Sequence, residues 1–195
     1  MSNKEDLTKK TDTKRLLIET VKELLKEDSE ISIKEIATAA SINTAAVNYH
    51  FGTKENLIAI ATNEIIDELK QQIFIFSEYA EKKPDQALET FISELSIFTT
   101  NYKGLVKQLL IAQSNDSNYF AVFMNDQKFI GLITEKIAKL GGSDSIYDAY
   151  AKFYILATSI CVPLLFDDVV TNNPFKFNNP EFLKCFLNQL YKILK

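Results

Sequence analysis

Histidine, cysteine, glycine and proline are all scarce in this sequence. The 195 residues include one histidine, two cysteines, five glycines and four prolines. The single histidine, His50, has no nearby motif that would supply a nucleophile or a carboxylate partner, which argues against a catalytic role. There is no GxGxxG motif, P-loop or metal-ligand cluster, so the sequence supports no enzyme, nucleotide or zinc chemistry and we expect no cofactor.

The two cysteines also bear on the cellular compartment in which the protein is expected. Cys161 and Cys185 form no C-x-x-C pair and fall in apolar helical patterns, where reduced core thiols are more common than a disulfide. The N-terminus has no apolar segment of the kind found in secretory signals. The most apolar run, residues 153–166, is too short to span a bilayer and contains Pro163, so it is expected to be a buried helix. We therefore expect a cytoplasmic protein.

The sequence has no excess of basic residues, although nucleic-acid-binding proteins usually have one. Its 22 lysines and arginines face 26 acidic residues, for a net charge of -4. Any attraction to DNA must therefore come from where the charges lie. Hydrophobic residues make up 46% of the chain, which is enough for a packed core.

Apolar residues recur at helical spacing along most of the chain, and no segment has the alternation of a β-strand. Few glycines and prolines also favour long helices. The sequence therefore predicts an all-α fold of about nine helices. The predicted N-caps of the first four helices are Thr13, Ser32, Asn43 and Thr53, with Glu35 completing a capping box and the fourth helix running to about Lys82.

Residues 33–57 carry the functional signal. They predict two short helices joined by a tight turn, with Ile36, Ala40, Ile42, Val47 and Phe51 facing inward. The outer face of the second short helix is small and polar, which suits the major groove of DNA.

Hydrogen-bond donors follow that outer face. Tyr49, His50 and Lys54 can all donate to phosphates, and Lys54 lies at a helix N-terminus, where backbone N–H groups also favour an anion. A further group of basic residues lies upstream and is equally compatible with a solvated helix face or an arm that touches the DNA backbone. This group is Lys9, Lys10, Lys14 and Arg15.

The segment resembles the TetR family of one-component repressors. The most diagnostic string is Tyr49-His50-Phe51, followed by Lys54-Glu55, and the resemblance extends back to about Thr13. It implies a homodimer that reads a palindromic operator and a variable C-terminal domain that binds a small molecule. Two departures from the family pattern are Ser41 in place of the usual turn glycine and Asn48 in place of a common tyrosine.

These observations predict a helix-turn-helix domain over residues 1–56 and a helical effector-binding and dimerisation domain over residues 57–195. The expected function is transcriptional repression under the control of a small, largely apolar effector. The candidate DNA-binding residues are Ser32, Asn43, Thr44, Ala45, Ala46, Asn48, Tyr49, His50 and Lys54.

The C-terminal region allows more than one interpretation. Its aromatic stripes would either line an effector cavity or only fill the core. The helices near residues 145–170 and 182–194 are apolar on more than one stripe, which predicts a four-helix interface between two copies. Alternatives are a regulator controlled by a protein partner, and a helical carrier or enzyme with a degenerate motif. The candidate effector residues are Phe98, Tyr102, Phe120, Phe123, Tyr150 and Tyr154.

Overall fold

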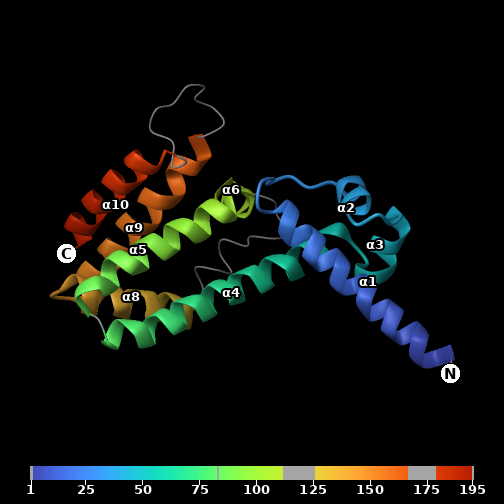
Figure 1. The fold of residues 1–195 in the computed structure, drawn as a ribbon, viewed down its shortest axis with the longest axis horizontal. Helices are drawn as coiled ribbons and strands as arrows, with labels where there is room; N and C mark the ends of the chain where they lie inside the picture. Colours follow the sequence, from blue (N-terminus) through green and yellow to red (C-terminus); the bar gives the residue numbers. More distant parts are fainter. Residues whose placement is uncertain (1, 83, 112–125, 167–178, 195) are drawn as a thin grey trace. The chain divides into compact units, whose positions relative to one another are not determined.

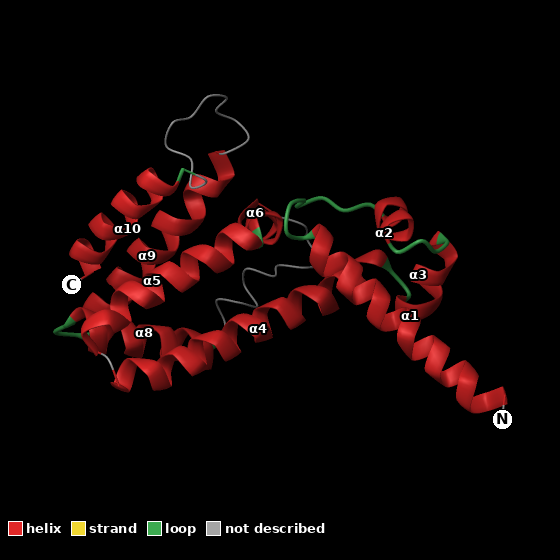
Figure 2. Cartoon of the chain, viewed as in Figure 1, coloured by secondary structure: helices red, strands yellow, loops and turns green. Residues whose placement is uncertain are grey.

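The computed structural model describes residues 2–82, 84–111, 126–166 and 179–194 (Figure 1). This part of the chain is helical and contains no strand (Figure 2), which confirms the all-α prediction. Its helices are α1 (Ser2–Leu24), α2 (Ile33–Ala39), α3 (Thr44–Phe51), α4 (Lys54–Lys82), α5 (Pro84–Asn101), α6 (Lys103–Ile111), α8 (Gln127–Gly141), α9 (Ile146–Phe166) and α10 (Pro180–Leu194).

The start of α1 differs from the prediction. The helix begins at Ser2, so Thr13 lies inside it and the predicted cap there is wrong. Residues 2–12 contain no glycine or proline, and nothing in their sequence therefore stops the helix from extending toward the N-terminus.

The other three N-caps are confirmed. Glu35 N donates to Ser32 Oγ at 3.2 Å while Ser32 N donates to Glu35 Oε2 at 2.7 Å, which is a complete capping box. Asn43 Oδ1 accepts from the backbone of α3 at 2.8 Å, and Thr53 Oγ1 accepts from the backbone of α4 at 3.1 Å. Each cap satisfies a backbone donor that the first turn of a helix would otherwise leave unpaired.

The chain divides into two compact units. Of the described residues, 2–67 and 102–111 form the first unit, and 68–101, 126–166 and 179–194 form the second. The first unit therefore contains α1, α2, α3 and α6, and the second contains α5, α8, α9 and α10. α4 contributes residues to both units.

The core of the first unit is built on α1. Two positions of this helix and one in the turn that follows it, at i, i+4 and i+8, have no exposed surface: Leu17, Val21 and Leu25. Full burial of each such side chain contributes about 1.5–3 kcal/mol. The fully or almost fully buried side chains that the other helices of the unit supply are Ile36, Val47, Leu57, Ala61, Ile65 and Leu105.

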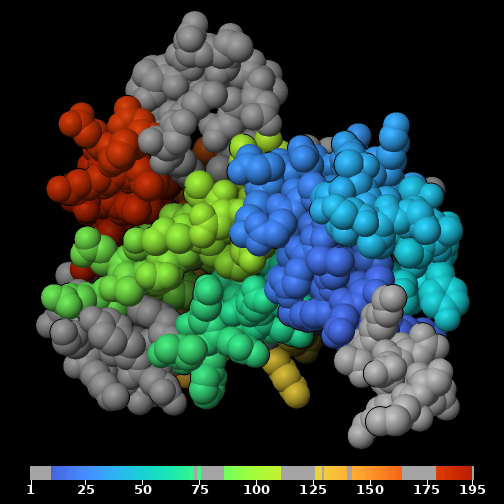
Figure 3. All heavy atoms as spheres, turned by 45° about the vertical axis from the view of Figure 1, so that its right-hand side comes forward, coloured from blue at the N-terminus to red at the C-terminus, as the bar shows by residue number. Residues whose placement is uncertain are grey.

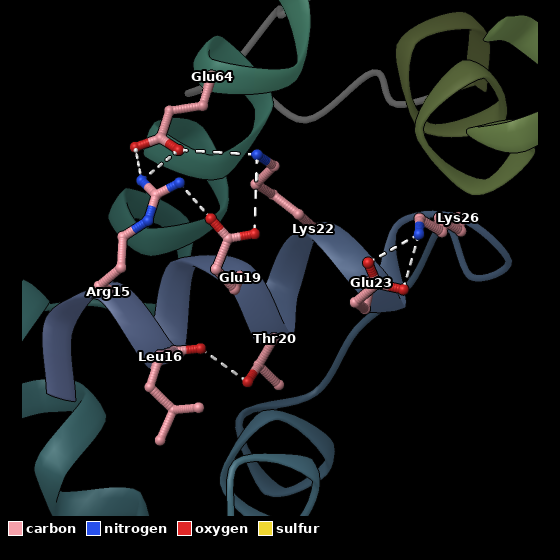
Figure 4. Close-up of polar contacts among 8 residues, drawn as sticks. All are labelled: Arg15, Leu16, Glu19, Thr20, Lys22, Glu23, Lys26 and Glu64. Carbon is pink, nitrogen blue, oxygen red and sulfur yellow. Dashed lines mark hydrogen bonds and ion pairs between the residues drawn. The ribbon is translucent and has the colours of Figure 1, made fainter. Parts of the chain in front are cut away.

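A cluster of ion pairs joins α1 to α4 within the first unit (Figure 4). Arg15 Nη1 lies 3.0 and 2.8 Å from the two carboxylate oxygens of Glu64, and Arg15 also pairs with Glu19. The hydrogen bond to Glu64 raises the pKa of Arg15 above its ordinary value. Lys22 Nζ is 3.9 Å from Glu64, and the Lys22 side chain is only 8% exposed. Of the two basic side chains, Lys22 is the more buried, so the stability of its positive charge depends more on its acidic partners.

α6 packs end-on against the turn that directly follows α1. The backbone N–H groups of Gly104 and Leu105 donate to the carbonyl oxygens of Lys26 and Leu25, at 3.3 and 2.9 Å. Donors from a helix N-terminus therefore satisfy acceptors at a helix C-terminus, where both would otherwise need water or a side chain. The sequence pattern gave no indication of this contact between segments about eighty residues apart.

The close approach of α6 requires a glycine. A Cβ on Gly104 would lie 2.6 Å from both the backbone nitrogen and the backbone oxygen of Asp28. An ion pair between Lys103 Nζ and Glu27 Oε2, at 2.5 Å, adds a side-chain contact at the same place.

The second unit has its core between α5, α8, α9 and α10. α9 buries Ala149, Phe153, Leu156 and Ile160, which recur at helical spacing, while its opposite face is exposed. One face of α9 is therefore buried within the chain, while the predicted burial of its remaining apolar surface against a second copy stays a prediction. The buried apolar residues from the other helices include Leu88, Phe91, Ile92, Ile133, Ile137, Leu190 and Leu194.

Both cysteines are free. Cys161 is half-buried on α9, and burial raises the pKa of its thiol to about 11, which disfavours the reactive thiolate. Cys185 is exposed on α10, because its position lies away from the helix face that carries the buried Leu190 and Leu194. The prediction that Cys185 is a core residue is therefore wrong. No described helix has both the length and the apolar character needed to cross a membrane.

The α1–α6 contact predicts an unequal response to alanine at two helical glycines. Gly104→Ala should lower the free energy of unfolding by about 1–3 kcal/mol, because the added Cβ has no space against Asp28. Gly131→Ala, in α8, meets no atom within 4 Å and should raise it by about 0.5–1 kcal/mol. Urea titration of both variants measures the difference, and a fully stable Gly104→Ala protein would contradict the contact.

Candidate nucleic-acid interface

The turn between α2 and α3 is held by the backbone. Ile42 N donates to Ala37 O at 2.9 Å and Ser41 N donates to Thr38 O at 3.1 Å. Ser41 has a φ of 56°, so the position that the TetR resemblance assigns to a glycine does adopt the left-handed conformation. Serine accepts this conformation at a cost of about 1–2 kcal/mol.

α3 has one buried and one exposed face. Val47 has no exposed surface and Phe51 is 8% exposed, so these two side chains attach the helix to the unit. Thr44, Ala45 and Asn48 are exposed, and Tyr49 is 71% exposed. The predicted inward and outward faces are therefore confirmed. Figure 3 shows the atoms of α2 and α3, in light blue and cyan, at the surface.

Gly52 ends α3 and places the start of α4 beside it. Its φ is 76°, which favours glycine, and its N–H donates to Asn48 O at 2.8 Å. Asn56 Nδ2 donates to Phe51 O at 2.9 Å, so a side chain of α4 satisfies a carbonyl at the end of α3. Lys54 follows directly, with its side chain 33% exposed and its Nζ 3.6 Å from Glu55 Oε1.

Two lysines of α1 lie over the aromatic rings at the end of α3. Lys10 Nζ is 5.0 Å from the centre of the Tyr49 ring, and Lys14 Nζ is 6.0 Å from the centre of the Phe51 ring. These distances fit cation–π contacts. The spacing of the two lysines, at i and i+4 on one helix face, was visible in the sequence, but their proximity to α3 was not.

The upstream basic group does not act as one surface. Arg15 is bound to Glu64 and Glu19, whereas Lys10 and Lys14 lie near α3. The side chain of Lys9 lies outside the described residues.

His50 lies among these aromatic and basic groups. Its ring is half-buried and meets the Tyr49 ring edge-on, with centres 5.1 Å apart at an angle of 77°. Burial lowers the pKa of His50, and the positive charges of Lys14 and Lys10 lower it further. Its Nδ1 is buried and has no hydrogen-bond partner in the described part of the chain.

The candidate DNA-binding residues all lie on three consecutive helix starts or on α3. Ser32 and Asn43 are the N-caps of α2 and α3. Ala46 lies in the first turn of α3 and is half-buried. The structure thus brings these candidates together in the first unit, with Lys10 and Lys14 as neighbours that the candidate set did not contain.

The candidate effector residues have different environments. Phe98 is buried in α5, and Tyr102 is half-buried in the first unit. Tyr150 and Tyr154 are 41% and 55% exposed on α9. Phe120 and Phe123 lie outside the described residues.

A groove of about 520 Å³ lies in the second unit between α4 and α8. Of the candidate effector residues that the structure describes, Phe98, Tyr102, Tyr150 and Tyr154, none is among the described residues that line this groove. Three of its described lining side chains are apolar, and a salt bridge of 2.5 Å joins Lys70 Nζ to Asp126 Oδ2. The lining residues are Lys70, Gln71, Phe74, Ile75, Asp126, Lys128 and Leu132.

No protein-family model and no curated protein matches the sequence. Solved structures do match. HlyIIR, a hemolysin II transcriptional regulator, has a TM-score of 0.61 at 17% identity, over 93% of this chain and 98% of its own. Native NalD, the secondary repressor of the MexAB-OprM multidrug efflux pump in Pseudomonas aeruginosa, has a TM-score of 0.58 at 15% identity, over 95% and 96%. A second NalD structure gives 0.56 at 18% identity, over 96% of both chains.

Proposed function

We propose that this chain, which has the fold of TetR-type regulators, is a homodimeric DNA-binding repressor of transcription under the control of a small, largely apolar effector. The observation that carries the proposal is the exposed, small-residue face of α3 with lysines beside it. The matched proteins are described as a transcriptional regulator and a repressor, which favours regulation over enzymatic activity. A protein that binds chromosomal DNA would act in the cytoplasm.

α3 would enter the major groove. The small side chains of Thr44, Ala45 and Ala46 allow the helix to approach base edges and thymine methyl groups, and Asn48 can read adenine. Asn43 uses Oδ1 for its cap, which leaves its amide nitrogen able to donate to DNA.

Groups around α3 would hold the DNA backbone. Tyr49, His50 and Lys54 can donate to phosphate oxygens on one side of the helix, and Ser32 lies at the start of α2. Phosphate contacts fix the register of a protein on the duplex, while base contacts choose the sequence.

The acidic net charge does not oppose this proposal. Several acidic side chains of the first unit are engaged by basic ones away from α3, as in the Glu64–Arg15, Glu23–Lys26 and Glu27–Lys103 contacts. Opposite charges that lie this close largely cancel beyond a Debye length, about 10 Å at 0.1 M salt. The lysines near α3 then set the local field.

An exposed apolar stripe on α9 supports the homodimer. Tyr147, Tyr154, Ile155 and Val162 are 82%, 55%, 39% and 39% exposed and recur along the face opposite the α9 core residues. Apolar surface arranged in one stripe along a helix is typical of an interface. A two-fold axis would pair this stripe with its copy and would give two α3 helices for two half-sites about 34 Å apart.

The α4–α8 groove supports an effector. Its volume falls within the range of small-molecule sites, about 300–1,000 Å³, and Phe74, Ile75 and Leu132 give it apolar walls. Lys70 and Lys128 would suit a polar or anionic end of such a molecule. α4 is continuous from Lys54 to Lys82, so a ligand that shifts this helix would change the spacing of the two α3 helices.

DNA binding can be tested at Lys54. Lys54→Ala should weaken binding to all duplexes and reduce the slope of log affinity against log salt by about one, because one phosphate contact is lost. Lys26→Ala is the matched control, since Lys26 pairs with Glu23 in an exposed contact of the same unit. Fluorescence anisotropy with a duplex from upstream of the gene measures both. Equal slopes for the two variants would contradict the phosphate contact, and no binding by the wild type would contradict the function.

The homodimer can be tested at Ile155. Ile155→Asp should place a carboxylate in the interface and weaken association by about 3 kcal/mol or more, over a hundredfold in Kd. Thr100→Asp adds the same charge at an exposed position of α5 and should leave association unchanged. Light scattering at micromolar concentration should show a wild-type dimer and an Ile155→Asp monomer. A monomeric wild type would overturn the proposal.

The effector site can be tested with a thermal-shift screen of apolar, aromatic and fatty-acid-like compounds. A ligand at about a hundredfold excess over its Kd should stabilise the wild type by about 2.7 kcal/mol. Leu132→Trp, which narrows the groove, should abolish the shift, while Ile97→Trp on the exposed face of α5 should keep it. If no compound raises the melting temperature, control by a protein partner becomes the better account.

A further inference from the structure

His50 is the only histidine in the chain and therefore the only side chain whose ordinary pKa lies near neutrality. The centre of its ring lies 5.1 Å from that of Tyr49 and 6.4 Å from that of Phe51. The buried Nδ1 lacks a hydrogen-bond partner in the described part of the chain. A half-buried imidazole whose Nδ1 has no acceptor has little to stabilise a positive charge, and burial accordingly lowers the pKa of His50.

The charges that reach His50 are positive. Lys10 and Lys14 both lower its pKa, after burial, and both lie over aromatic rings adjacent to it in sequence. On α4, the nearest charged residues along the chain are Lys54 and Glu55, which pair at 3.6 Å and largely cancel. On α3 the other titratable side chain is Tyr49, whose ring meets the His50 ring edge-on.

This arrangement suits an anion. The ammonium groups of Lys10 and Lys14 lie over the rings on either side of His50 in sequence, and both are close enough to act electrostatically on its imidazole. A phosphodiester placed there would neutralise the two lysines and would offer an oxygen that accepts from a protonated imidazole. Both changes favour the charged form of His50.

We propose that Lys10, Lys14 and His50 form a binding site for a phosphate of the DNA backbone, and that His50 takes up a proton when the phosphate binds. The site rests on the proposed DNA binding and adds that DNA binding is coupled to the uptake of a proton. Lys10 and Lys14 supply most of the electrostatic attraction, while His50 makes that attraction depend on pH.

The sign of the linkage follows from the two states. The pKa of His50 is depressed in free protein and rises in the complex, so binding takes up a proton at pH values between the two. DNA affinity therefore increases as pH falls through that interval. One histidine sets a maximum of about tenfold per pH unit for each copy of the chain, and the dependence disappears well above or below both pKa values.

The wild-type protein allows a direct test, because a single histidine gives a single set of imidazole signals. NMR of the full chain labelled with ¹⁵N-histidine, titrated between about pH 5 and pH 8, gives the pKa of His50 in the free protein. The same titration with a saturating short duplex of random sequence gives it in the complex. We expect a higher pKa in the complex. An equal or lower value would overturn the proposal.

Variants separate the parts of the site. His50→Gln should still bind the duplex near pH 8 but should lose the pH dependence of affinity. Lys10→Gln with Lys14→Gln should weaken binding at every pH and reduce the salt slope by about two. Lys26→Gln, which removes one positive charge just beyond the other end of α1, should change neither quantity.

The outcomes distinguish this site from the proposed function. If the wild type binds no duplex at any pH, DNA binding fails and the site fails with it. If it binds with an affinity that does not change between about pH 6 and pH 8, DNA binding stands and the proton linkage is wrong. If His50→Gln keeps the wild-type pH dependence, another group carries the proton and the assignment to His50 is wrong.

Discussion

The fold of the first unit depends on the burial of two helices that are too short to be stable alone. α2 has seven residues and α3 has eight, and isolated helices of this length are not stable in water. Ile36 and Val47 are completely buried in a core built on α1 and the first turns of α4. The exposed face of α3 can carry small and polar residues only because Val47 and Phe51 on its other face supply the packing energy.

Because α2 and α3 are too short to be stable alone, side-chain caps and turn conformations at their ends also matter. Caps at Ser32, Asn43 and Thr53 satisfy donors at three successive helix starts within little more than twenty residues. Ser41 adopts a left-handed conformation to keep the turn short, and Gly52 does so to begin α4 directly. Each local feature contributes only about 1 kcal/mol, but together they determine where α3 points.

The sequence predicted local features well because their causes are local. Three of the four predicted caps and the inward and outward faces of α3 follow from residues a few positions apart, and the structure confirmed them. The contacts that it did not predict join distant segments. Gly104 against Asp28 and Lys10 over Tyr49 leave no periodic pattern, because each depends on how whole helices pack. The start of α1 was wrong because Thr13 suits a cap but does not force one.

Apolar side chains in the second unit show a further limit of sequence reasoning. Phe98 and Tyr154 occur in similar helical stripes, yet one is buried and the other is 55% exposed. Periodicity shows that a helix has an apolar face and does not show what covers it. α9 is apolar around most of its circumference, so its sequence alone could not show that only one of its faces would pack within the chain.

The end-on contact of α6 limits how the first unit can change shape. Two backbone hydrogen bonds join α6 to α1, and both use groups that secondary structure leaves unpaired. If α6 moved away, these donors and acceptors would need new partners and the fully packed Leu105 would lose its contacts. A small displacement of α6 therefore costs less when the end of α1 moves with it. Since α1 carries both the core of the unit and the lysines over α3, α6 and the candidate interface are mechanically connected through one helix.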